Sequence, residues 1–71
     1  MLEGIPKRIV EIVLEQRSVS DSTIKLQIDD LTSDKAVAAQ TAKLQKQGLI
    51  AENPLAAGRW HITDAGRSAL D

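Results

Sequence analysis

The sequence predicts a small, mostly helical α+β domain, and three observations support this fold class. Apolar residues recur at helical spacing between Ile5 and Arg17. A later helical pattern stops at Gly48, and the alternation over residues 59–62 that follows is typical of a strand. A length of 71 residues suffices for one domain with a limited core, so we expect a single domain over residues 1–71.

The first helix is expected over residues 5–17, with Pro6 in its first turn, where the missing N–H costs no hydrogen bond. Its apolar arc is wide, because Val10 and Leu14 lie on the flank of the stripe. A helix packed centrally among others has such an arc, and a dimerisation face has one too. A homodimer through this helix is therefore one expectation.

A short second helix is expected from Thr23 to Asp29, after the polar segment 18–22, which offers several N-cap candidates. It would bury Ile24 and Ile28, which lie four residues apart. The helical spacing of this pair predicts one apolar stripe on a short helix.

The third helix follows a turn over residues 31–34. Thr32 or Ser33 can act as its N-cap, because a side-chain hydroxyl accepts a hydrogen bond from a free N–H of the first turn. The helix should end at Gln47, since Gly48 is the residue type that most often follows a last helical turn.

Past the third helix the pattern changes to short extended segments. We expect a strand over residues 49–51, a loop over 53–58 and a second strand over 59–62, which together form a two-stranded hairpin. Thr63 can cap a last short helix over residues 64–70.

Two short helices joined by a turn and followed by a hairpin form the arrangement of a winged helix-turn-helix domain. The segment Leu44-x-x-x-Gly48-Leu49-Ile50 resembles the passage from the recognition helix to the wing in MarR-type and PadR-type regulators. Residues 60–67, Trp-His-Ile-Thr-Asp-Ala-Gly-Arg, are similar to their strand-to-helix signature, aromatic–x–Leu/Ile–Thr–x–x–Gly–Arg/Lys. The resemblance implies three helices, a two-stranded wing, a short C-terminal helix and DNA binding.

Charge is distributed unevenly along the chain. Residues 1–34 carry four basic and seven acidic groups, a balance of −3, whereas residues 35–67 carry five basic and two acidic groups, a balance of +3. Such asymmetry is expected where one face of a protein meets phosphates. The net charge of −1 by itself favours no polyanionic partner.

The third helix supplies most of the candidate DNA-binding residues. At about 100° per residue, Val37, Thr41 and Leu44 point inward together, and the opposite face is small in its middle and basic at its ends. Small side chains let a helix sit deep in a major groove, where alanine can touch a thymine methyl group and lysines can reach phosphates. The candidates are Ser33, Lys35, Ala39, Ala42, Lys43 and Lys46 on the helix, Arg59 at the wing and Arg67 in the signature. The alternative for Arg59 is a solvent-exposed strand arginine, and the alternative for Arg67 is a helix cap or an ion pair with Asp64 or Asp71.

We therefore expect a small transcriptional regulator that binds double-stranded DNA. Helix 33–47 would enter the major groove, with Ser33 as a base contact, and the wing over 53–59 would lie on the backbone or in the minor groove. The alternative is a winged helix that contacts a partner protein in a larger complex, with the alanine face as the contact and the lysines solvated. Trp60 is expected in the core, because it shares a strand face with Ile62.

The sequence gives no support for catalysis or for a cofactor. His61 is the only histidine and cysteine is absent, so neither a metal site nor a histidine-based triad is expected. The paired Asp29-Asp30 is better explained by a solvated turn. No apolar run approaches the ~20 residues that span a bilayer, and residues 1–8 lack the order of a secretory signal, so we expect a cytoplasmic protein that is not an enzyme.

Overall fold

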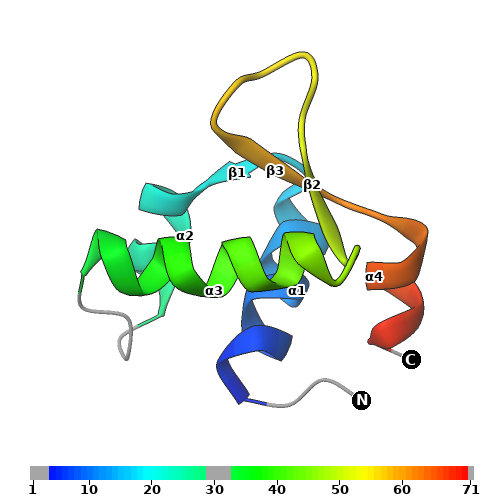
Figure 1. The fold of residues 1–71 in the computed structure, drawn as a ribbon, viewed down its shortest axis with the longest axis horizontal. Coiled ribbons are helices and arrows are strands. Elements are labelled where there is room, and N and C mark those ends of the chain that lie inside the picture. Colours follow the sequence, from blue (N-terminus) through cyan, green and yellow to red (C-terminus); the bar gives the residue numbers. More distant parts are fainter. Residues whose placement is uncertain (1–3, 29–32, 71) are drawn as a thin grey trace.

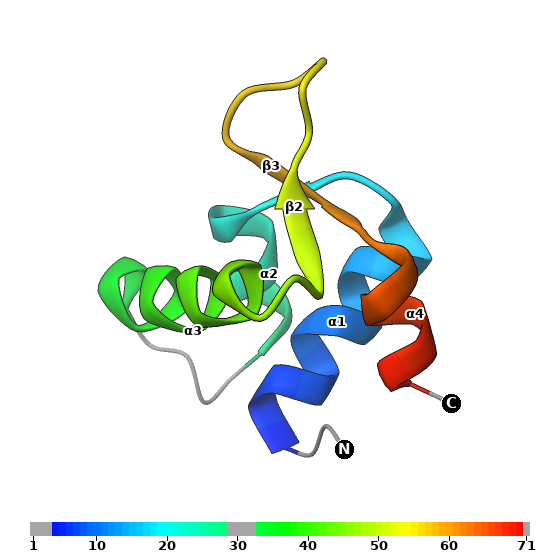
Figure 2. The same ribbon diagram turned by 45° about the vertical axis from the view of Figure 1, so that its right-hand side comes forward.

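Four helices and one antiparallel sheet of three strands make up residues 4–28 and 33–70, the parts of the chain that the computed structural model describes (Figures 1 and 2). The expected α+β class with a majority of helix is confirmed. The elements in chain order are α1 (Gly4–Gln16), β1 (Val19–Ser20), α2 (Asp21–Gln27), α3 (Asp34–Lys46), β2 (Ile50–Glu52), β3 (Arg59–Ile62) and α4 (Asp64–Ala69).

The sheet contains one strand more than the sequence predicts. The hairpin of β2 and β3 forms as expected, with Ile50 opposite Ile62. β1 joins the other edge of β3, where Val19 lies opposite Trp60, and the strand order is β1-β3-β2. The sequence pattern predicts only a polar segment over residues 18–22, because a strand of two residues is too short to show an alternation. Val19 is nevertheless buried and belongs to the core.

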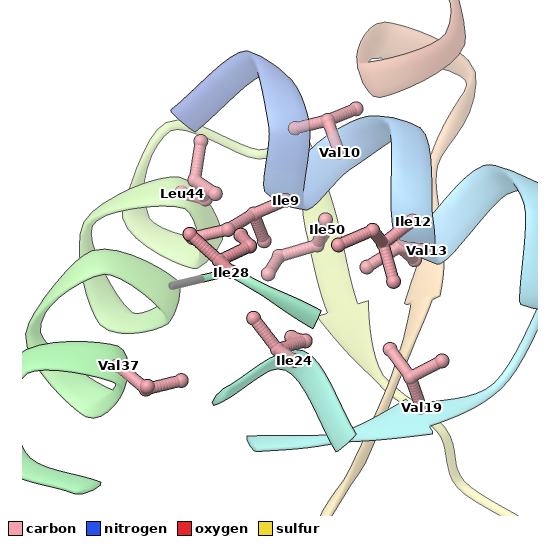
Figure 3. Close-up of a cluster of buried hydrophobic side chains, with 10 residues drawn as sticks. All are labelled: Ile9, Val10, Ile12, Val13, Val19, Ile24, Ile28, Val37, Leu44 and Ile50. Carbon is pink, nitrogen blue, oxygen red and sulfur yellow. The ribbon is translucent and has the colours of Figure 1, made fainter. Parts of the chain in front are cut away.

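The helix α1 lies at the centre of the core. Its residues Ile9, Val10, Ile12 and Val13 are completely buried, and Figure 3 shows them among side chains from the other helices and the sheet. Because Val10 is buried within the protomer, it is not available as half of an apolar pair for dimerisation. The buried apolar cluster comprises Ile9, Val10, Ile12, Val13, Val19, Ile24, Ile28, Val37, Leu44 and Ile50.

The helix α2 begins two residues earlier than the sequence predicts. Ser20 is its N-cap, and the Ser20 hydroxyl accepts a hydrogen bond from the Thr23 backbone N–H at 3.3 Å. The helix therefore starts at Asp21, a residue whose carboxylate suits the first turn because of the helix dipole. The helix ends at Gln27, two residues before the expected Asp29, because the C-cap Ile28 already has extended backbone angles (φ −125°, ψ 105°).

Both ends of α3 agree with the sequence prediction within one residue. Ser33 is the N-cap, and its hydroxyl accepts a hydrogen bond from the Ala36 backbone N–H at 3.1 Å. The alternative cap, Thr32, lies outside the described residues. At the other end Gln47 is the C-cap, and Gly48 has a φ of 78°, a left-handed conformation that glycine adopts without steric cost.

The helix α4 is fixed to the turn that follows α3. Thr63 is its N-cap, accepts a hydrogen bond from the Gly66 backbone N–H at 3.0 Å and donates one to the Gly48 carbonyl at 2.6 Å. Gly66 packs so closely on the Leu49 carbonyl that a Cβ atom there would overlap it. The cap from Thr63 and the close packing of Gly66 together give a physical reason for these two residue types, three positions apart, in the segment 60–67.

Candidate nucleic-acid interface

The inward face of α3 is a narrow apolar stripe, as expected. Val37, Thr41 and Leu44 are at most 1% exposed. The buried Thr41 hydroxyl donates to the Val37 carbonyl at 3.1 Å, one turn earlier in the same helix. Its polar atom is thus satisfied within α3, and the stripe needs no polar partner from another element.

The outward face of α3 is exposed along the whole helix. Its middle consists of alanine side chains, which leave the helix backbone accessible, and lysines lie at both ends. Asp34, the one acid of α3, is exposed in its first turn and lies at the edge of this face, four residues before Ala38. We call this outward face the α3 face, and its residues are Lys35, Ala38, Ala39, Ala42, Lys43 and Lys46.

An ion pair lies at the start of α3, whose first residue is Asp34. Lys25 and Asp34 form an ion pair with an Nζ–Oδ1 distance of 3.3 Å. Both side chains are solvent-accessible, so the pair stabilises the fold little. The pair does, however, place the Lys25 ammonium group next to the Asp34 carboxylate, which is the negative charge nearest in sequence to the α3 face. At the other end Lys43 and Lys46 lie in the last turn, where positive charge is favoured by the helix dipole.

Ser33 lies at the start of the α3 face, where its side chain has a structural role. Its hydroxyl oxygen accepts the Ala36 N–H, and the residue itself is exposed. The hydroxyl proton remains able to donate to an acceptor, such as a base edge or a phosphate oxygen. A substitution of Ser33 will therefore change the stability of α3 as well as any contact that it makes.

The loop 53–58 between β2 and β3 projects from the body of the molecule (Figures 1 and 2). Asn53 organises its base: the Asn53 backbone N–H donates to the Arg59 carbonyl at 2.8 Å, and its side-chain oxygen accepts from the Leu55 N–H at 2.9 Å. The tip carries no charge, and Leu55 is 95% exposed.

Arg59 is exposed, as expected, but it lies at the base of the projecting loop. Its backbone pairs with Ser20 of β1, and its guanidinium donates to the Ser18 carbonyl across 3.5 Å. A hydrogen bond of this length is weak, so most of the guanidinium donors stay open to a ligand. That Arg59 shares one continuous surface with the lysines of the α3 face stays a prediction.

Arg67 is placed apart from the other candidates. It lies on α4, which both views show on the other side of the molecule from most of α3 (Figures 1 and 2). Its side chain lines a half-open hollow of about 470 Å³, which we call the basic hollow and which is lined by Leu14, Arg17, His61, Ile62 and Arg67. Arg17 is not among the predicted site residues, since nothing in the sequence pattern indicates that it meets His61 and Arg67, which lie 44 and 50 positions further along the chain.

Trp60 packs against the core, as expected, and it makes a contact that the sequence did not indicate. Its indole Nε1–H donates to Asp21 Oδ1 at 2.8 Å, which ties the start of α2 to β3. An indole held by packing and by a hydrogen bond is not available as a stacking platform for a base.

Comparisons of the chain with protein-family models, with curated proteins and with solved structures find no match. Within residues 4–28 and 33–70, no three His, Cys, Asp or Glu side chains are grouped so that they could hold a metal ion. Over the same ranges no helix has the length and apolar character needed to cross a membrane. The pair Asp29-Asp30 lies outside the described residues.

Proposed function

We propose that this chain is a winged helix-turn-helix domain that binds double-stranded DNA as a small regulator, with α3 as its recognition helix. The α3 face carries this proposal: three exposed alanines lie in the middle of a 13-residue helix, with lysines at both ends, and the one acid at its edge, Asp34, is paired with Lys25. A helix with this profile can approach the base edges of a major groove closely while its lysines meet the phosphates on either side.

The hairpin that follows α3 supports the same proposal. In a winged helix-turn-helix domain the hairpin is the wing, and here the loop 53–58 projects far enough to reach beyond the body of the fold (Figure 1). Its tip is uncharged, so Arg59 at its base is the group that would meet the backbone or the minor groove. The absence of arginine and asparagine on the α3 face favours modest rather than strict sequence preference.

A partner protein is the second candidate, and exposed apolar side chains favour it. Leu26 on α2 is 84% exposed and Leu55 at the loop tip is 95% exposed. Exposed leucines are common singly on protein surfaces, but an uncharged loop tip is unusual for a surface that must meet phosphates. In this alternative the alanines of the α3 face would pack on the partner.

The experiment that tests the proposal is an NMR titration of the protein with a generic DNA duplex. We expect progressive shifts of the backbone amides over α3 and residues 53–59, because these segments would contact the grooves and the backbone. Lys46→Gln removes a charge from the α3 face and should weaken binding. The matched control is Lys7→Gln, which removes the same charge from the exposed first turn of α1, at the end of the molecule away from the loop (Figure 1).

Two results would decide against DNA. If the duplex shifts no amide of α3, the α3 face is not a DNA-binding surface. If Lys7→Gln and Lys46→Gln weaken binding equally, the attraction is a diffuse effect of charge and not a contact of this helix.

A further inference from the structure

The basic hollow is lined by two arginines from distant parts of the chain and by His61. Arg17 follows α1, His61 lies on β3 and Arg67 lies on α4. Leu14 and Ile62 supply an apolar part of the lining, and none of the five lining residues is acidic. Groups of one sign that converge from distant parts of a chain repel each other, so their meeting in one hollow favours a ligand of the opposite sign.

Neither arginine of the basic hollow is neutralised within the described residues. Over residues 4–28 and 33–70 there is one ion pair with an N–O distance of 4 Å or less. It joins Lys25 and Asp34, which do not line the basic hollow. The guanidinium groups of Arg17 and Arg67 therefore have no described carboxylate within this distance. A guanidinium offers a planar set of N–H donors that matches two oxygens of an oxyanion.

The backbone of Arg17 gives an independent reason to assign a role to its side chain. Arg17 has a φ of 67°, a left-handed conformation that residues with a Cβ atom rarely adopt. Its N–H donates to the Val13 carbonyl at 2.8 Å and so ends α1. Glycine would make this turn without steric cost, so the turn itself does not explain an arginine at position 17.

We propose that the basic hollow binds a small phosphate monoester, with Arg17, His61 and Arg67 around the phosphate group and Leu14 and Ile62 against an apolar body. Two guanidinium groups match a dianion, whereas a carboxylate carries one negative charge and needs one guanidinium. The volume of about 470 Å³ lies in the range of small-molecule sites. This site is separate from the α3 face and does not depend on DNA binding.

The test is an NMR titration of the protein with phenyl phosphate, in which the shifts of the backbone amide signals are measured. We expect saturable shifts centred on residues 14–17, 61–62 and 67, and weaker binding of inorganic phosphate, which lacks the apolar body. Arg17→Gly removes the side chain and suits the left-handed backbone, so the variant should fold at least as well as the unmodified protein. It should lower the affinity for phenyl phosphate about tenfold, and Arg67→Gln should do the same.

The control is Lys46→Gln, which removes a charge outside the hollow and should leave the affinity for phenyl phosphate unchanged. Unchanged affinity in Arg17→Gly would overturn the proposal, as would shifts that spread over the lysines of α3. No saturable shift up to about 10 mM phenyl phosphate would overturn it as well.

A DNA duplex distinguishes a free phosphate monoester from the DNA backbone as the source of the anion. If Arg17→Gly has a lower affinity for phenyl phosphate but binds the duplex with full affinity, the hollow is a separate small-molecule site, as proposed. If phenyl phosphate does not bind and Arg17→Gly weakens duplex binding, the hollow belongs to the DNA interface and this inference is wrong, while the proposed DNA binding stands.

Discussion

The helices α1 and α3 are both 13 residues long, yet the rest of the fold covers them very differently. On α1 two adjacent pairs, Ile9 with Val10 and Ile12 with Val13, are completely buried, so a wide arc of the helix is covered. On α3 the buried residues form a narrow stripe, and the α3 face is open along the helix. The helix α1 therefore holds the domain together, whereas the α3 face remains exposed and accessible to a partner.

The largest expected effect on stability comes from the covered helix. Ile12→Ala should lower the free energy of unfolding by about 2–5 kcal/mol, because it removes apolar contacts and leaves a cavity in a small core. Urea denaturation measures this change. Leu26→Ala is the control, since Leu26 is 84% exposed and should change the stability by less than about 0.5 kcal/mol. Similar losses in the two variants would contradict the view that α1 is the centre of the core.

A second variant tests how the end of α3 is anchored. Gly66→Ala should lower the free energy of unfolding by about 1–3 kcal/mol, because the added Cβ would overlap the Leu49 carbonyl just after α3. The thermal midpoint of unfolding reports the loss. Ser68→Ala on the exposed side of the same helix is the control and should leave the midpoint nearly unchanged. A fully stable Gly66→Ala would show that α4 does not pack on this turn.

A third variant separates the cap of α3 from its exposed face. Ser33→Ala should cost about 0.5–2 kcal/mol of stability, because the Ala36 N–H loses its acceptor. Ser33→Asn should retain most of the stability, since asparagine is an equally good N-cap. A change in preference among duplex sequences in this capped variant would support the base contact predicted for Ser33; an unchanged preference would leave Ser33 with its capping role alone.

The smallest effect on stability and a large effect on binding are expected in the middle of the α3 face. Ala42→Glu should change the free energy of unfolding by less than about 0.5 kcal/mol, because the position is exposed. It should abolish duplex binding, since a longer, negatively charged side chain would enter the major groove, where the proposal places a small alanine. Ala65→Glu adds the same charge to an exposed position on α4 and serves as the control in a fluorescence anisotropy assay with labelled duplex. Equal losses in both variants would remove the special role of α3.

Local signals in the sequence predicted most elements of the fold. The cap Ser33, the stop at Gly48, the strand over 59–62 and the cap Thr63 each depend on one residue type or a short pattern, and the structure confirms all four. β1 was missed because its two residues become a strand only by pairing with β3, which lies about 40 positions away.

The candidate site was predictable where a single helix carries it. The wheel of α3 separated its buried stripe from its exposed face, because the period of a helix is known in advance. Arg67 could not be placed in this way, since its neighbours Arg17 and His61 come from other elements. The sequence also left two interpretations of the wide apolar arc on α1, central packing or a dimerisation face. Only the structure, in which Val10 is buried within the protomer, distinguishes them.

The dependence of duplex affinity on salt concentration is the decisive test of DNA binding by α3. Each lysine or arginine that neutralises a phosphate releases counterions, so four contacts from Lys35, Lys43, Lys46 and Arg59 should give a slope of log affinity against log salt of about −4. The variant in which all three lysines are alanine should bind weakly, with a slope of about −1. Affinity that does not change with salt, or a triple variant that binds like the unmodified protein, would contradict DNA binding by α3.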